Sequence, residues 1–130
     1  MRTSDMLEFK GKLPSSSRRN ELEEAASQAN RLFMLISFPR LDAINRIDGF
    51  EAGDAHLEAA YQALVDKVLV CGRYAGGKLG AVAEVTSETD ALDMAADLFE
   101  IAACAGVETH VGGAWSGNVR PMGAKRRAAL

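Results

Sequence analysis

The stretch Lys67 to Thr86, KVLVCGRYAGGKLGAVAEVT, decides how the rest of the chain is interpreted. Two apolar runs, Val68 to Cys71 and Leu79 to Val85, flank a centre that contains three glycines. Branched residues favour extended backbone and glycine favours turns, so this pattern predicts a β-hairpin.

The same letters nearly spell a phosphate-binding loop, because Gly72 to Lys78 fits G-x-x-x-x-G-K. A true motif has Ser or Thr after the lysine to hold magnesium, and it opens a helix whose amides bind the phosphates. Here Leu79 follows the lysine, and LGAVAEV has the composition of a strand. The sequence therefore favours the hairpin over the phosphate loop.

Composition indicates one soluble domain. The chain has 130 residues, 48% hydrophobic and 25% charged, with a formal charge of -3. This balance gives no reason to expect a nucleic-acid or membrane surface. Cys71 and Cys104 are expected to be buried free thiols, and no long apolar segment is present, so we expect a cytoplasmic protein.

The segment before the hairpin contains one helix and one ambiguous run. From Arg18 to Phe33 apolar residues recur at helical spacing, which predicts a helix. Leu32 to Phe38 is almost wholly apolar and is either a strand or the end of that helix. The proline that follows, Pro39, favours a buried strand.

Two further helices are predicted. Arg40 to Gly53 is expected to be a connection with one helical turn, and Asp54 to be the N-cap of a helix. After the hairpin, Ser87 is expected to cap a helix that ends at Gly106. The buried stripes are expected to be Leu57, Ala60, Tyr61, Leu64 and Val65 in the first and Leu92, Ala95, Leu98, Phe99 and Ala102 in the second.

A last strand is predicted at Val107 to Val111. Three regions follow from this organisation: an N-terminal extension with a helix (residues 1–31), a core domain (32–115) and a basic tail (116–130) expected to be disordered. The order of elements within the core predicts an α+β fold of the ferredoxin-like βαββαβ type, with one antiparallel four-stranded sheet. Both helices would then cover one sheet face, and a second copy of the chain would cover the other.

The order of elements, and in particular CGRYAGGKLGAVAEVTSETDALDMAADLF followed by VETHV, resembles the dimeric α/β-barrel superfamily, especially its small bacterial members. The resemblance covers about Leu32 to Trp115. It implies a homodimer. The superfamily includes monooxygenases, haem-degrading enzymes and isomerases, so the resemblance implies no single activity. Fold alone does not choose among these.

Strand alternation suggests a candidate catalytic group. If the more apolar face of each strand packs on the helices, Glu84, Glu108 and His110 project from the open side. An imidazole near a carboxylate suits general acid–base chemistry. The alternative is that these residues hydrogen-bond across an interface or meet solvent.

Three further residues are candidates for substrate binding: Arg73, Tyr74 and Trp115. Trp115 is alternatively an interface anchor. His56 is expected to be structural or exposed. No His, Cys, Asp or Glu pair has metal-ligand spacing, so neither a metal nor another cofactor is predicted.

The sequence leaves three functions open. The first is a homodimeric protein that binds a small ligand or a partner. The second is a cofactor-independent monooxygenase or isomerase that acts on an aromatic or carbonyl substrate. The third is an assembly subunit that binds neighbours through its N-terminal helix and basic tail.

Overall fold

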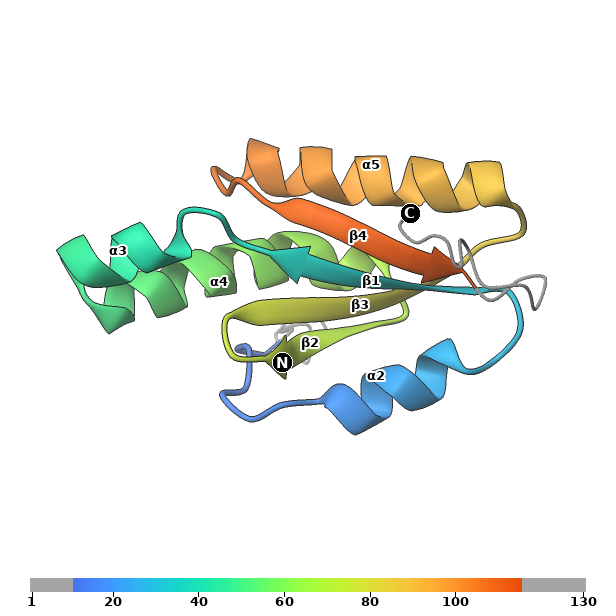
Figure 1. The fold of residues 1–130 in the computed structure, drawn as a ribbon, viewed down its shortest axis with the longest axis horizontal. Coiled ribbons are helices and arrows are strands. Elements are labelled where there is room, and N and C mark those ends of the chain that lie inside the picture. The colour runs from blue at the N-terminus through green and yellow to red at the C-terminus, as the bar shows by residue number, and fades with distance from the viewer. Residues whose placement is uncertain (1–10, 116–130) are drawn as a thin grey trace, which may run out of the picture.

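The computed structural model describes residues 11–115, which form an α+β fold (Figure 1). The sheet has the strand order β2-β3-β1-β4, and every pair of neighbours is antiparallel. Along the chain the elements are α2 (Arg19–Ala26), β1 (Arg31–Ser37), α3 (Leu41–Asp48), α4 (Phe50–Leu64), a 3₁₀ turn (Val65–Lys67), β2 (Val70–Ala75), β3 (Lys78–Glu84), α5 (Glu88–Cys104) and β4 (His110–Trp115). The predicted α+β class is confirmed.

The β2–β3 hairpin is confirmed. Its turn is made by Gly76 and Gly77, and Gly76 adopts a φ of +53°, which favours glycine. The residues after Lys78 form a strand, as expected from their composition, so the G-x-x-x-x-G-K letters do not open a helix.

The ambiguous run Leu32 to Phe38 is a strand for most of its length. α2 ends at Ala26, earlier than expected, and Asn30 adopts a φ of +62° immediately before β1 begins. Burial alternates along β1, with Leu32 and alternate residues fully buried. This alternation is typical of a strand whose two faces meet different environments.

The connection after β1 is more helical than expected. α3 forms two turns instead of one, and α4 begins at Phe50, so Asp54 lies inside a helix and is not its N-cap. Gly49, with a φ of +96°, separates the two helices. Two helices therefore join β1 to β2, and the βαββαβ order as expected is not confirmed.

α5 begins as predicted, because Ser87 Oγ accepts a hydrogen bond from the Asp90 amide at 3.0 Å. Gly106 follows the helix with a φ of +86°, the left-handed conformation expected there. The predicted buried stripe is only partly correct, however. Leu92 and Phe99 are 53% and 45% exposed, because the face of α5 that meets the core contains Ala91, Leu98 and Ala102 instead.

The last strand is displaced from its predicted position. Residues 107–109 precede β4, although Val107 and Thr109 are buried, and the strand itself continues to Trp115. Gly113 lies in the middle of β4, where a Cβ would come within 3.1 Å of Leu32 Cδ1. The absence of a side chain at Gly113 therefore lets the Leu32 side chain of β1 pack closely on β4.

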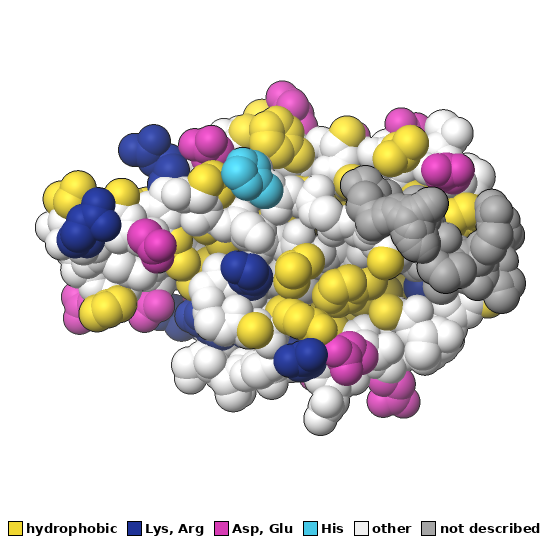
Figure 2. Space-filling view, in the orientation of Figure 1, with side chains coloured by type: hydrophobic (Ala, Val, Ile, Leu, Met, Phe, Trp, Pro, Cys, Tyr) yellow, Lys and Arg dark blue, Asp and Glu magenta, His cyan; other side chains and the backbone are white. Residues whose placement is uncertain are grey.

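The main core lies between one face of the sheet and the helices α4 and α5. α2 packs on the opposite face over β2 and β3, with Leu22 fully buried. The chain therefore covers part of the face that a second copy was expected to cover. Towards β4 none of the helices in residues 11–115 packs on this face, and hydrophobic side chains gather across its middle (Figure 2).

Residues 1–10 and the basic tail, 116–130, lie outside the described residues, and the expected boundaries of the three regions stay predictions. None of the helices in residues 11–115 combines the length and apolar character needed to cross a lipid bilayer.

Candidate functional site

Of the three predicted catalytic residues, Glu84 lies far from the other two. Glu84 lies opposite Arg31 at one end of β1, and His110 lies opposite Ser37 at the other. Arg31 and Ser37 are six positions apart along β1, which corresponds to about 20 Å. Glu108 is exposed in the segment before β4, two residues from His110. The sheet therefore does not bring Glu84 and His110 together.

Arg73 joins three segments of the chain. Its Nε donates a hydrogen bond to the carbonyl of Pro14 at 3.1 Å, and its Nη2 lies 3.6 Å from Asp54 Oδ1 of α4. The guanidinium side chain is only 15% exposed. Arg73 thus places a positive charge within ion-pair distance of the exposed Asp54 carboxylate.

Tyr74 packs against α2. Its hydroxyl donates to Glu23 Oε2 at 2.7 Å, and this hydrogen bond raises the pKa of Tyr74. The Arg19 guanidinium lies 4.9 Å from the centre of the Tyr74 ring, and the Phe33 ring lies 5.3 Å from it. Trp115 packs against the main core at the end of β4, on the helix side of the sheet.

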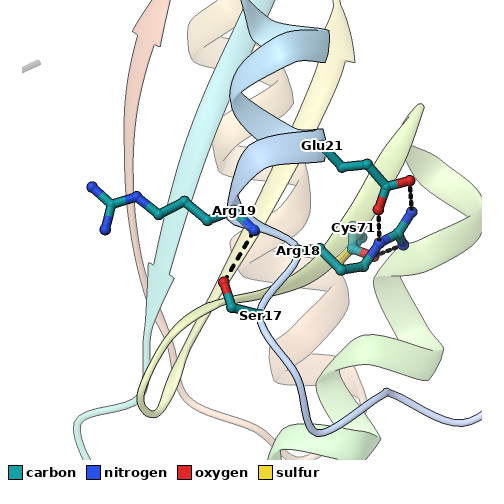
Figure 3. Close-up of polar contacts among 5 residues, drawn as sticks. All are labelled: Ser17, Arg18, Arg19, Glu21 and Cys71. Carbon is teal, nitrogen blue, oxygen red and sulfur yellow. Dashed lines mark hydrogen bonds and ion pairs between the residues drawn. The ribbon is translucent and has the colours of Figure 1, made fainter.

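The segment that leads into α2 holds the outer edge of β2 (Figure 3). The Arg18 amide donates to the Arg73 carbonyl at 2.8 Å, and its Nη1 donates to the Cys71 carbonyl at 3.0 Å. Glu21 accepts two hydrogen bonds from the same guanidinium, which raises the pKa of Arg18. These contacts anchor α2 on the sheet.

A cleft of about 260 Å³ lies between α3, α4 and the β2–β3 turn. Its volume is slightly below the usual range for small-molecule sites. The lining combines two leucines and one aromatic ring with polar side chains. It consists of Leu41, Asp42, Asn45, Phe50, Gly53, Asp54, Leu57, Arg73, Gly76 and Gly77.

Two glycines allow the walls of this cleft to approach each other. A Cβ at Gly53 would overlap the carboxamide of Asn45, and a Cβ at Gly77 would overlap the side chain of Leu41. The absence of side chains at these two positions therefore lets α3 pack close to α4 and to the hairpin turn.

The polar side chains of the cleft are suited to hydrogen bonding with the edge of a planar ligand. The Asn45 side chain lines the cleft, and its Oδ1 is buried against Gly53 without a hydrogen-bond partner among the described residues. The Asp54 side chain is 72% exposed, so its carboxylate faces solvent beside Arg73. Together they offer a carboxamide and a carboxylate on the two facing helices.

A second hollow of about 280 Å³ adjoins the first and shares Leu41, Asp42 and Gly77 with it. It also contains the first residues of β3 and β4, Lys78 and His110. The first hollow thus contains a carboxamide, an arginine and the Asp54 carboxylate, the second contains a lysine and a histidine, and the Asp42 carboxylate lines both.

Asn45 and Asp54 were not predicted as site residues, because Arg40 to Gly53 was expected to be a connection with one helical turn and Asp54 to be an N-cap. The signal that was available is the spacing Gly49-x-x-x-Gly53-Asp54. A glycine between two helices, followed by another one turn later, is typical of a close helix–helix contact. Among residues 11–115 no three His, Cys, Asp or Glu side chains are grouped so that they would hold a metal ion.

No family model matches the chain, and no curated protein matches it. Among solved structures it is similar to the diguanylate cyclase SiaD from Pseudomonas aeruginosa, crystallised with its activator SiaC. The TM-score is 0.55 and the identity 18%, over 74% of this chain and 42% of that chain. It is also similar to the coiled coil and GGDEF domain of DgcB from Caulobacter crescentus in complex with c-di-GMP. There the TM-score is 0.61 and the identity 12%, over 85% of this chain and 72% of that chain.

At these identities the likeness shows the fold alone, and the chain spans less than half the length of SiaD. A small α+β fold with a four-stranded sheet fits the ferredoxin-like class. Membership of the dimeric α/β-barrel superfamily stays a prediction.

Proposed function

We propose that this chain binds a guanine nucleotide in the cleft between α3, α4 and the β2–β3 turn. The observation that carries the proposal is the pair of polar side chains in the lining, the carboxamide of Asn45 and the solvent-facing carboxylate of Asp54. The similarity to a domain that was solved with c-di-GMP supports the choice of ligand class.

The edge of guanine fits these groups better than the edge of adenine does. Guanine presents two adjacent N–H donors on its Watson–Crick edge, and a carboxylate accepts from both. The carboxamide of Asn45, which lines the same cleft, adds N–H donors. Adenine has an unprotonated ring nitrogen where guanine has one of those N–H groups, so it would face the Asp54 carboxylate with repulsion.

The second hollow would accommodate the phosphate groups of the nucleotide. With the base held by Asn45 and Asp54, the rest of the nucleotide extends towards Lys78 and His110. An ammonium group at this position attracts phosphate as a point charge. The proposal therefore gives the Lys78 side chain a role in affinity and none in base selection.

The test is calorimetric titration of the full chain with GMP, GTP, c-di-GMP and AMP. Wild type is expected to bind the guanine nucleotides more tightly than AMP. Asp54→Asn removes the charged acceptor, and a hydrogen bond to a charged group contributes about 1.5–3 kcal/mol. Guanine affinity should therefore fall about tenfold to hundredfold.

Asp48→Asn is the matched control, because Asp48 is an exposed acid at the end of α3 that does not line the cleft. It makes the same charge change and should leave the affinity unchanged. Equal affinity of wild type for GMP and AMP, or an equal effect of the two substitutions, would contradict the proposal.

We also propose that the chain associates with itself, as expected from the sequence, through the open part of the sheet face. Phe33 and Leu35 of β1 are only half-buried there, and Ala114 of β4 is exposed. Phe33→Asp should then shift the mass measured by light scattering to that of the monomer, and a monomeric wild type would reject the idea. The monooxygenase, isomerase and assembly-subunit alternatives stay predictions.

A further inference from the structure

The first residue of α4, Phe50, is the most exposed large hydrophobic side chain in the described part of the protein, with 77% of its surface accessible. It nevertheless lines the cleft, together with Asn45 and Asp54. The aromatic ring thus stands at the mouth of the site and is not part of the core.

The fold does not depend on the Phe50 side chain. The start of α4 is held by its backbone, since the amides of Ala52 and Gly53 both donate to the Gly49 carbonyl, at 3.1 and 3.2 Å. Phe50 is also absent from the main core and from the partly buried residues packed against it. Packing therefore gives no reason for an aromatic residue at this position.

The chemistry of the cleft does give a reason. A flat base whose edge meets Asn45 and Asp54 exposes its two faces to the remaining walls. Those walls contain the Phe50 ring and two apolar side chains, Leu41 and Leu57. An aromatic ring beside a base gains stacking energy that does not depend on the base's hydrogen-bonding pattern.

We propose that Phe50 is the stacking surface for a purine base in this cleft. This inference rests on the proposed function and adds to it one residue with a separate role in binding. Asn45 and Asp54 select guanine by its edge, and Phe50 contributes affinity for the flat bicyclic ring.

A neighbouring residue provides a control of the same character. Ile47 is 74% exposed and lies in the last turn of α3, three positions before Phe50. It does not line the cleft. Truncating either side chain removes one exposed apolar group near the junction of α3 and α4. Of the two, only Phe50 would contact the proposed ligand.

The experiment titrates wild type, Phe50→Ala, Phe50→Trp and Ile47→Ala with GMP and with ribose 5-phosphate, which has no base. Loss of one stacking partner is expected to weaken GMP binding about fivefold to hundredfold in Phe50→Ala. Ile47→Ala should bind GMP like wild type, and ribose 5-phosphate should not distinguish the variants. Phe50→Trp should retain GMP binding and show fluorescence quenching beyond that of Trp115 in wild type.

Two results would overturn the inference while leaving the proposed function intact: equal GMP affinity of Phe50→Ala and wild type, or an equal loss in Phe50→Ala and Ile47→Ala. Absence of GMP binding to wild type would instead reject the proposed function, and the inference with it. Melting temperatures of all variants, measured without ligand, should agree with wild type, and this separates loss of binding from loss of folding.

Discussion

Leu22 of α2 lies directly against Gly80 of β3, and a Cβ placed on that glycine would come within 2.9 Å of Leu22 Cδ1. Leu22 is fully buried, although α2 is only eight residues long. Isolated helices of this length are unstable in water, so the contact with the sheet maintains α2.

Leu22→Ala should therefore lower the free energy of unfolding by about 2–5 kcal/mol, the usual cost of truncating a buried leucine. Urea unfolding followed by circular dichroism measures this. Asn20→Ala, an exposed position on the same helix, should change it by less than about 0.5 kcal/mol. Equal values for the two variants would mean that α2 does not pack on the sheet as described.

Gly53→Ala should reduce GMP binding by about tenfold or more, because the added methyl group occupies the space of the Asn45 carboxamide and moves it. Alanine is otherwise favoured over glycine within a helix by about 1 kcal/mol, which limits the loss of stability. Gly112→Ala is the control, since a Cβ there would meet nothing within 4 Å. Titration of both variants with GMP checks the prediction, and unchanged affinity of Gly53→Ala would show that the carboxamide position does not matter.

The two cysteines should differ in reactivity. Cys71 is buried in the core, and burial raises its pKa to about 12, so almost no thiolate forms at neutral pH. Cys104 is exposed at the end of α5. A disulfide reagent added to the native protein at pH 8 should react quickly with one thiol and with the second only after denaturation. Cys104→Ser should abolish the fast reaction, and a fast reaction in that variant would contradict the buried position of Cys71.

Acid should destabilise the fold partly through His56. Burial, and secondarily the positive charge of Arg40, lowers the pKa of His56, and its Nε2 is buried without a partner among the described residues. The unfolded chain, in which histidine titrates near 6.5, then binds more protons than the native one. Stability should thus fall as the pH drops below about 7 and level off below the native pKa.

Replacing His56 by Gln should reduce the fall in melting temperature between pH 7 and pH 5, because glutamine does not titrate. Thermal unfolding of both proteins across this range measures the difference. The same slope in the two proteins would show that His56 does not contribute.

Local patterns were enough to predict the hairpin and the start of α5. The glycines of the hairpin turn and the Ser87 cap act within a few residues, so their effects can be predicted from neighbouring letters. The same holds for β1, where proline after a short apolar run correctly favoured a strand.

The candidate site depended on contacts that local patterns do not contain. Alternation along a strand indicates which face a side chain occupies but not its height on the sheet. Glu84 and His110 were grouped for that reason, although register places them at opposite ends of β1. Asn45 and Asp54 come together only because Gly49 turns the chain between two helices, and that turn was predicted as part of a loop.

The contacts of Arg18 also make the β2 edge of the sheet different from the β4 edge. Its amide and guanidinium occupy carbonyls along the rim of β2, and a shift in register at Arg73 and Ala75 distorts that rim further. Within residues 11–115 no segment pairs with the outer edge of β4, and the strand contains no Lys, Arg, Asp or Glu. Among the described residues, the edge of β2 is therefore partly occupied and the edge of β4 has no partner, so that a strand added to residues 11–115 would pair more readily with β4.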